Sequence, residues 1–313
     1  MIIKENEPLN DKNWFQTGGP ARYFCESSNE IEFKQALDFS KEQNLEIFIL
    51  GHGANILISD DGFDGLVIRP KKTDVHIAID DKSQALVTAG AGDLMDELIQ
   101  FTLDHNLIGL EEFSNIPGTI GGSVFINLHY FEHFLSHFLV GAQVINRETG
   151  EVENVDNSWF DFGYDKSKLM EHKHYLISAT FQLKKVSDVD AAFAKGRRTE
   201  IVRQRTSRYP VSNTCGSFFR NFHPEEVSLV CNGKPMIYAA FYLDKVGVRG
   251  ILECNGTCVS YQHANMIVSC KTATSKDIVE VARKMQEKVK EQFNVVLQPE
   301  CLLIGFKEYP LLK

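Results

Sequence analysis

The chain has 313 residues, more than a single domain usually has, so we expect two or three folding units. Its composition is that of a folded globular protein, with 43% hydrophobic and 24% charged residues. The formal net charge of −9 argues against a nucleic-acid-binding surface, because neutralising phosphates requires clustered Lys and Arg. Enzymes and small-molecule-binding proteins both remain open.

The cysteines and the hydropathy pattern indicate a cytoplasmic protein. Seven cysteines, an odd number without a CxxC pair, favour reduced thiols. Cys254 and Cys258 are close in sequence, but no second Cys or His pair follows with ligand spacing, so we expect no metal site. The N-terminal segment lacks the pattern of a signal peptide, and no apolar run reaches the ~18 residues of a membrane span.

The first 110 residues mix helical and extended patterns. Residues 30–44 have helical spacing, and 93–106 form a second predicted helix in which Asp93 is the expected N-cap. The expected strands are 45–50, 66–70, 75–79 and 85–90. Several strands follow one another without helices between them, so the sequence predicts an α+β fold.

The segment "LGHGANIL", residues 50–57, follows a predicted strand. Gly51 and Gly53 allow the backbone amides of residues 52–55 to turn toward an anion such as a phosphate. An ordinary turn at the end of a strand explains the same pattern.

The segment "SNIPGTIGGSVFIN", residues 114–127, is more informative. Pro117 restricts one φ angle, and the glycines at 118, 121 and 122 remove side chains, so a large ligand can lie against the backbone. Two such glycine segments in one fold favour a dinucleotide as the bound ligand. Since the GxGxxG fingerprint is absent, we do not expect the Rossmann mode of binding.

The second half of the chain has three clear elements. Residues 175–183 alternate apolar and polar side chains, as a strand buried on one face does. A charged helix at about 187–207 is the expected boundary between domains. Residues 275–293 form an amphipathic helix that begins near Ser275 or Asp277. Its expected core side chains are Ile278, Ala282, Met285, Val289 and Phe293.

The stretch "NTCGSFFRNF", residues 213–222, places Ser217 between a glycine and two phenylalanines. A serine hydroxyl donates a proton only when it is held within hydrogen-bond reach of a developing carbanion. Gly216 would leave room for that approach, and Phe218 and Phe219 would anchor the segment in a dry environment. A packed turn without chemistry is the alternative.

Together these segments resemble the MurB family, the FAD-dependent UDP-N-acetylenolpyruvoylglucosamine reductases. The similar motifs are "FQTGGPARYF" (15–24), "LGHGANILISDDGFDGLVI" (50–68), "IPGTIGGSVFIN" (116–127), "GSFFRNF" (216–222), "VGVRGILECNGTCVSYQHANMIV" (246–268) and "LQPECLLIGF" (297–306). The resemblance implies an FAD-binding region of the vanillyl-alcohol-oxidase type with two subdomains, residues 1–70 and 71–200. A smaller α+β substrate domain would then comprise residues 201–313.

The resemblance also implies a reaction. NADPH reduces the flavin, and the flavin reduces UDP-N-acetylglucosamine enolpyruvate to UDP-N-acetylmuramate for peptidoglycan synthesis. Ser217 would protonate the substrate carbon, and Glu300 would stabilise the enol or relay a proton. The expected FAD-binding residues are Gly51, His52, Gly53, Ala54, Asn55, Ile116, Pro117, Gly118, Thr119, Gly121, Gly122 and Asn127.

The UDP-sugar is the expected small-molecule partner, and the sequence indicates no oligomeric state. Asn221 and Tyr164 match substrate-binding positions of the family. Arg205 would contact the diphosphate, a role for which Arg203 and Arg208 compete.

The chain departs from the family at the segment "FGYDKSKLM", residues 162–170. Tyr164 and Ser167 match, but Asp165 occupies the position of an arginine that stabilises the enolate. Losing such a group typically costs ~10²–10³ in rate. Lys166 is the candidate replacement, although an extended segment would point it the opposite way. The alternatives to the reductase are therefore a flavoprotein with a different substrate and a catalytically silent FAD-binding protein.

Smaller departures are Ala54 and Phe222, where the family has serine and proline. Residues 128–138, "LHYFEHFLSHF", also replace a run of small residues. His129, His133 and His137 recur at a spacing of four, which on a helix places them on one face. That spacing suits metal ligands and equally an amphipathic surface segment.

Overall fold

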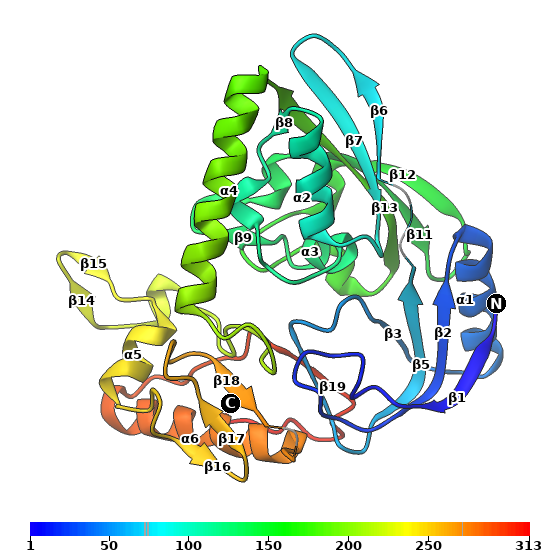
Figure 1. The fold of residues 1–313 in the computed structure, drawn as a ribbon. Coiled ribbons are helices and arrows are strands. Elements are labelled where there is room, and N and C mark those ends of the chain that lie inside the picture. Colours follow the sequence, from blue (N-terminus) through cyan, green and yellow to red (C-terminus); the bar gives the residue numbers. More distant parts are fainter. Residues whose placement is uncertain (72, 74, 271) are drawn as a thin grey trace. The chain divides into compact units, whose positions relative to one another are not determined.

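The computed structural model describes residues 1–71, 73, 75–270 and 272–313 (Figure 1). The chain forms two compact units, each assembled from separate stretches. The first unit contains Met1–Glu5, Tyr23–His52 and Gly65–Arg205, and the second contains Asn6–Arg22, Gly53–Asp64 and Thr206–Lys313. The division into 1–70, 71–200 and 201–313 stays a prediction. In the described part of the chain, no helix is long and apolar enough to cross a membrane.

The larger sheet of the first unit is antiparallel, with strand order β12-β11-β13-β7-β6, and β8 pairs with β13 (Figure 1). Its strands are β6 (His76–Asp80), β7 (Gln84–Gly90), β8 (Leu107–Ile108), β11 (Leu139–Asn146), β12 (Val152–Asp156) and β13 (His174–Lys185). The predicted strands at 75–79, 85–90 and 175–183 are confirmed. In β13 the side chains of Tyr175, Ala179, Phe181 and Leu183 are buried, as the alternation predicted.

Two helices pack against this sheet, α2 (Met95–Asp104) and α3 (Ile120–Phe125) (Figure 1). Met95, Leu98 and Ile99 are fully buried in one core with sheet residues. Helical spacing thus directs one face of α2 to the sheet, and the predicted helix at 93–106 is confirmed.

The expected N-cap of α2 is wrong. Leu94 is the cap residue, and it makes no side-chain capping bond. The Asp93 carboxylate instead accepts hydrogen bonds from the backbone N–H groups of Thr73 at 2.6 Å and Gly90 at 2.7 Å. Asp93 therefore closes the turn after β7 and does not cap the helix, because its carboxylate bonds to backbone N–H groups that precede the helix.

A second sheet has the strand order β1-β2-β5-β3. Its strands are β1 (Ile3–Glu7), β2 (Ala21–Ser27), β3 (Ile47–Ile49) and β5 (Phe63–Pro70). Helix α1 (Glu30–Glu42) buries Phe33 and Leu37 against Leu66 in the same core. Asn29 caps α1 by accepting from the Glu32 N–H. The predicted helix and its neighbouring strands are confirmed.

Short elements and one long helix complete the first unit. The short elements are η1 (Glu111–Phe113), β9 (His129–Tyr130), β10 (His133–Phe134), η2 (Leu135–His137), η3 (Asn157–Phe160) and η4 (Lys168–Glu171). The long helix α4 (Asp188–Arg208) confirms the charged helix predicted at 187–207. The division between the two units falls in its last turn, after Arg205.

The second unit is built around helix α6 (Ser275–Phe293). Its other elements are β4 (Ile56–Ile58), η5 (Pro224–Glu226), β14 (Val230–Cys231), β15 (Lys234–Pro235), α5 (Ala239–Lys245), β16 (Glu253–Cys254), β17 (Thr257–Val259), β18 (Ile267–Ser269) and β19 (Leu302–Ile304). Ile278, Ala282, Met285 and Val289 are fully buried, and Phe293 is partly buried at the edge of the core. The predicted core face of this helix is confirmed.

Helix α6 begins at Ser275, as predicted, and Asp277 lies in its first turn. Thr274 is the N-cap and forms a capping box with Asp277. The Asp60 carboxylate, distant in sequence, accepts from the backbone N–H groups of Ser275 at 2.8 Å and Lys276 at 2.9 Å. Asp60 thus satisfies two amides of the first turn and places a negative charge at the positive end of the helix.

Replacing Asp60 with Ala should therefore destabilise the protein by about 1–2 kcal/mol, because two helix-terminal amides lose their acceptor. The urea midpoint, followed by far-UV circular dichroism, measures this. The neighbouring variant Asp61→Ala is the control and should change stability by less than about 0.5 kcal/mol. Equal midpoints for the two variants would contradict the capping role.

Candidate functional site

The first glycine segment can adopt its backbone path only with glycine at two positions. A Cβ on Gly51 would lie 2.5 Å from the Oγ1 of Thr119, so the two glycine segments contact each other here. Gly53 has φ +68°, and a Cβ there would lie 2.5 Å from the Lys12 carbonyl oxygen. His52, between them, is half-buried, and burial lowers the pKa of its imidazole.

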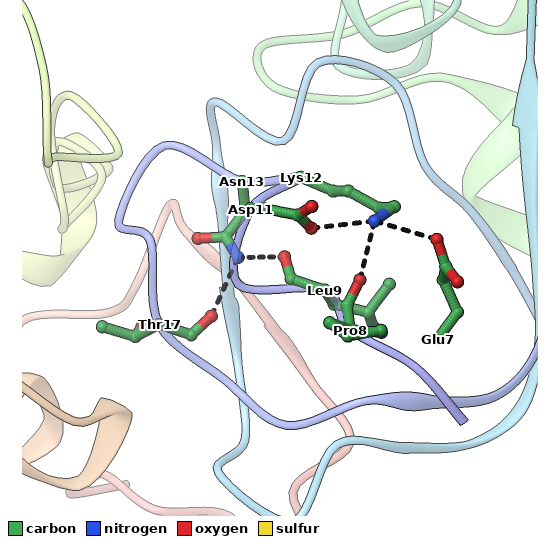
Figure 2. Close-up of polar contacts among 7 residues, drawn as sticks. All are labelled: Glu7, Pro8, Leu9, Asp11, Lys12, Asn13 and Thr17. Atoms are coloured by element: carbon green, nitrogen blue, oxygen red, sulfur yellow. Dashed lines mark hydrogen bonds and ion pairs between the residues drawn. The ribbon is translucent and has the colours of Figure 1, made fainter.

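The loop that contacts Gly53 is held by two polar side chains (Figure 2). The Lys12 ammonium donates to the Pro8 carbonyl at 2.9 Å and pairs with Asp11 and Glu7. The Asn13 amide donates to the carbonyls of Leu9 at 2.7 Å and Thr17 at 2.8 Å. The backbone N–H of Trp14 then donates to the Gly53 carbonyl. The loop therefore fixes the backbone of the glycine segment from one side.

Asn55 joins this segment to Glu300 within the second unit. The Asn55 amide lies 3.4 Å from the Glu300 carbonyl, and the Leu302 N–H donates to the Asn55 carbonyl at 3.1 Å. The parallel pairing of β4 with β19 continues this contact. The Oδ1 of Asn55 is buried and has no hydrogen-bond partner among the described residues. Ala54, beside it, is half-buried.

The second glycine segment leads into α3. Thr119 caps this helix by accepting from the Gly122 N–H at 3.3 Å. A Cβ on Gly121 would lie 3.0 Å from the Ala91 carbonyl oxygen, so glycine is needed for packing there. A Cβ added to Gly118 or Gly122 would have its nearest described atom 3.6 Å away, an ordinary contact, so packing does not require glycine at these two positions. Ile116, Pro117 and Gly118 are half-buried.

Asn127 connects this segment to the turn that carries Tyr164 and Asp165. Its amide donates to the Gly163 carbonyl at 2.9 Å, and its Oδ1 accepts from the Ser136 N–H at 3.1 Å. Asp165 has φ +50°, and Gly163 bridges to Lys166, so this segment forms a turn and is not extended. Lys166 is exposed and pairs with Asp161 at 2.7 Å.

The predicted helix face of three histidines is also wrong. His129 lies on β9 and His133 on β10, in a hairpin whose turn includes Phe131 at φ +53°, and His137 ends η2. The His129 ring stacks on its cross-strand partner Phe134, whereas His133 and His137 are exposed. Aromatic pairing across the two strands explains the hairpin, since helical spacing alone does not decide secondary structure.

Ser217 lies in a short extended segment within the second unit. It forms a β-bridge with Met266, and Phe219 forms one with Pro299 on the other side. Gly216 has φ +77°, and no described atom lies within 4 Å of where its Cβ would be. Glycine is therefore needed for the left-handed turn rather than for room beside Ser217. Phe218 and Phe219 are fully buried, as expected.

Backbone hydrogen bonds fix Ser217 and Glu300 near each other in this unit. The Phe218 carbonyl accepts from the N–H groups of Glu300 at 2.9 Å and Cys301 at 3.3 Å. Phe218 itself is fully buried, which keeps water from competing for these bonds. The buried Phe218 thus connects the two proposed catalytic residues, because Ser217 precedes it in the chain and Glu300 hydrogen bonds to its carbonyl.

Arg220 and Asn221, which follow Phe219, are held by polar contacts. The Asn221 Oδ1 accepts from the Ala239 N–H at 3.2 Å, at the start of α5. Arg220 makes a bidentate pair with Glu226, with distances of 2.7 and 2.6 Å. The Arg220 guanidinium lowers the pKa of Glu226 to about 2.

The three candidate arginines lie in different surroundings. Arg205 is half-buried, and its guanidinium lies 4.9 Å from the centre of the Tyr130 ring. Arg203 is exposed and makes a bidentate pair with Glu200. Arg208 is exposed. Arg205 alone of the three is held against an aromatic residue of the histidine hairpin.

Among the residues that the structure describes, no group of three or more His, Cys, Asp or Glu side chains is placed to hold a metal ion. The seven cysteines are free thiols. Cys254 and Cys258 lie on the paired strands β16 and β17.

Comparison with known proteins finds two family models that match the chain. Residues 21–156 match the FAD binding domain, and residues 207–304 match the C-terminal domain of UDP-N-acetylenolpyruvoylglucosamine reductase. The enzyme of that name from Pediococcus pentosaceus is 30% identical over 306 residues, covering 97% of this chain and 94% of the relative. The chain belongs to the UDP-N-acetylenolpyruvoylglucosamine reductase family.

Further relatives of this family cover the chain equally well. The reductase of a Synechococcus species is 31% identical over 315 residues, covering 99% of this chain and 94% of the relative. The crystal structure of the Thermus caldophilus reductase is 25% identical and has a TM-score of 0.76, covering 97% of this chain and all of that one. The predicted α+β fold and the resemblance to the family are confirmed.

The residues present fit the FAD that the family implies. Bare backbone at Gly118 and Gly122 lets a flat or phosphorylated group approach closely. The buried, unpartnered Oδ1 of Asn55 offers an acceptor to a hydroxyl or amine of a bound nucleotide. These features lie in the two segments that the sequence analysis selected.

Sequence reasoning missed the residue that holds the Ser217 segment. Asn265 is buried, its carbonyl accepts from the Phe218 N–H, and its side chain bonds both backbone groups of Phe219 at 3.1 and 2.7 Å. In the sequence, Asn265 lies within the segment 246–268, which indicates the family and gives this residue no role. An asparagine between apolar residues, which needs buried partners, was the signal available.

Replacing Asn265 with Ala should destabilise the protein by about 2–5 kcal/mol, because the buried N–H and carbonyl of Phe219 lose their partners. Urea unfolding measures the change. The control Gln262→Ala, which removes only two long hydrogen bonds, should cost less than about 1 kcal/mol. An unchanged midpoint for Asn265→Ala would show that water replaces the lost bonds.

The Arg220–Glu226 pair should stabilise the protein in a pH-dependent way. Because the folded-state pKa of Glu226 is below its ordinary value of 4.5, the contribution is complete above that value and is lost as pH falls toward 2. Glu226→Gln should cost about 1 kcal/mol or less at neutral pH, since the pair is partly exposed. The wild-type and variant urea midpoints should converge below pH 4.5. A constant difference would contradict the ion pair, and Glu225→Gln serves as the control.

Proposed function

We propose that the chain is an FAD-dependent, NADPH-driven UDP-N-acetylenolpyruvoylglucosamine reductase of peptidoglycan synthesis. The observation that carries the proposal is the segment around Ser217, which hydrogen bonds to the Glu300 segment through Phe218. The family supports the UDP-sugar as the substrate class. A cytoplasmic location fits this substrate and the free thiols.

FAD, when bound, supplies hydride transfer from NADPH to the substrate. The residues proposed to hold it are Gly51, His52, Gly53, Ala54, Asn55, Ile116, Pro117, Gly118, Thr119, Gly121, Gly122 and Asn127. The amide nitrogen and the Oδ1 of Asn127 both form hydrogen bonds with protein groups, so its proposed role is to hold the second glycine segment in place. The proposed FAD-binding subdomains, residues 1–70 and 71–200, each contribute one glycine segment.

Ser217 is proposed to donate a proton from Oγ to the substrate carbon next to the site of hydride addition. The backbone bonds of Phe218 and Phe219 restrict the position of Ser217, and their buried rings exclude water beside it. A hydroxyl held in this way avoids the entropic cost of finding its partner. Glu300 is proposed to stabilise the enol or to relay the proton.

Asn221, Tyr164 and Arg205 are proposed to bind the substrate. A guanidinium suits a diphosphate, and Arg205 is held in place by the Tyr130 ring. Lys166 is the candidate for the role of the family's arginine, and in this structure its ammonium pairs with Asp161 at the surface.

A different substrate on the same flavoprotein fold is the second candidate function. Asp165 favours it, because an anion at the position of the enolate-stabilising arginine opposes the developing charge. The side chain of Asp165 is only 20% exposed, so water screens this charge incompletely.

The variant Ser217→Ala should slow substrate-dependent reoxidation of the flavin by ~10²–10⁴, because the proton donor is lost. Reduction of the flavin by NADPH should be unchanged. Anaerobic stopped-flow absorbance at the flavin band measures both half-reactions in sequence. Ser228→Ala, an exposed serine of the same unit, is the control.

Two outcomes would contradict the proposal in different ways. Loss of both half-reactions in Ser217→Ala would make Ser217 structural. Wild-type protein that is reduced by NADPH but not reoxidised by the enolpyruvyl sugar would favour the different substrate.

A further inference from the structure

Two buried cysteines of the second unit lie beside the two proposed catalytic residues. Cys215 comes two positions before Ser217, and Cys301 directly follows Glu300. The two cysteines are almost fully buried, at 5% and 2% exposed, and belong to one apolar core together with Phe218. The reaction proposed above uses neither thiol.

Hydrogen bonds hold the two cysteine segments side by side. The Phe218 carbonyl accepts from the Cys301 N–H at 3.3 Å, and the Arg220 N–H donates to the Gln298 carbonyl at 2.9 Å. The Cys301 thiol also hydrogen bonds to the Cys215 thiol. The two sulfur atoms are therefore in contact within the second unit.

The two thiols differ in their surroundings. Gly216, next to Cys215, is partly exposed, and no described atom lies within 4 Å of where its Cβ would be. The backbone beside Cys215 therefore borders open space, from which a small neutral molecule can approach. Burial raises the pKa of the Cys301 thiol above its ordinary value, and its hydrogen bond to Cys215 acts in the same direction. Cys301 thus stays protonated near neutral pH.

We propose that Cys215 and Cys301 form a redox-sensitive pair, which hydrogen peroxide converts into a disulfide. Peroxide oxidises the Cys215 sulfur to a sulfenic acid, and one water is released. The Cys301 sulfur then forms the S–S bond with the Cys215 sulfur, and the sulfenic oxygen leaves with the thiol proton as a second water. Each sulfur loses one electron overall, and the two peroxide oxygens gain these two electrons.

The disulfide ties the Ser217 segment to the Glu300 segment. Two sulfur atoms in hydrogen-bond contact must move closer by roughly 1 Å or more to form a covalent bond. Because Phe218 connects the two segments, this movement shifts Ser217 relative to Glu300. A misplacement of about 1 Å can cost on the order of 10²-fold in rate. The effect on turnover, unlike the disulfide itself, rests on the proposed function.

Peptide mass spectrometry of the wild-type protein gives the first test. The FAD-loaded protein is treated with hydrogen peroxide, unfolded, alkylated with iodoacetamide and digested with trypsin without reduction. Cleavage after Lys and Arg places Cys215 in peptide 209–220 and Cys301 in peptide 291–307, each with a single cysteine. We expect the two peptides to be joined, and to separate again after treatment with dithiothreitol.

The rate of this oxidation is also predicted. Because the Cys301 thiol is buried and protonated, the joined peptides should form on the order of minutes to hours. Recovery of the two peptides unlinked after such treatment, whether alkylated or further oxidised, overturns the inference.

Cysteine variants assign the effect on the reaction to the pair. Peroxide should slow reoxidation of the wild-type flavin by the enolpyruvyl UDP-sugar ~10–100-fold, and dithiothreitol should restore the rate. Cys215→Ala and Cys301→Ala cannot form the disulfide, so peroxide should leave their own rates unchanged. Cys25→Ala, at a fully buried cysteine of a different core, is the matched control and should respond as wild type does. A Cys301→Ala protein that slows as much as wild type overturns the role of the pair.

The inference and the proposed function fail separately. Mass spectrometry detects the disulfide without turnover, so reduced wild-type protein that the sugar does not reoxidise overturns the function alone. Unlinked peptides from active, peroxide-treated protein overturn the pair alone. An unchanged rate in protein whose disulfide has formed overturns the effect of the disulfide on the reaction.

Discussion

The second unit depends on a few backbone hydrogen bonds around two buried phenylalanines. The segment from Ser217 to Arg220 has no regular sheet of its own, and it is held between Asn265 on one side and the 298–301 segment on the other. Because Phe218 and Phe219 are fully buried, their backbone groups must find protein partners. Asn265 supplies them from its side chain as well as its backbone. This constraint brings a serine hydroxyl and a glutamate from distant parts of the chain into one neighbourhood.

The glycine segments show a second constraint, that of close approach. Gly51 and Gly53 lack the space for a Cβ, because Thr119 and the Lys12 carbonyl occupy it. At Gly118 and Gly122 an added Cβ would make only ordinary contacts, so packing does not require glycine there. Glycines that look alike in the sequence therefore divide into those that packing requires and those that it does not require.

Two departures from the family pattern lie close together in the first unit. Asp165 stands where the family has an arginine, and residues 128–138, which contain the hairpin of β9 and β10, replace a run of small residues. The Nδ1 of His129 lies 3.4 Å from the Oδ1 of Asp165, so the two departures contact each other. Spacing along the sequence does not predict this contact, because a hairpin and a turn bring the two side chains together.

The sequence by itself determined the elements with strong periodicity, such as β13, α1 and α6, and the glycine and serine segments that identify the family. Side-chain spacing decides which face of an element is apolar, and that information is local. Only the tertiary structure decided that Asp60 caps α6, that Asp93 turns back to Gly90, and that residues 129–134 form a hairpin. In each case a polar or aromatic side chain has several possible partners, and only folding brings the observed partner into contact with it. The same reason explains why Asn265 and the His129–Asp165 pair were not found from spacing alone.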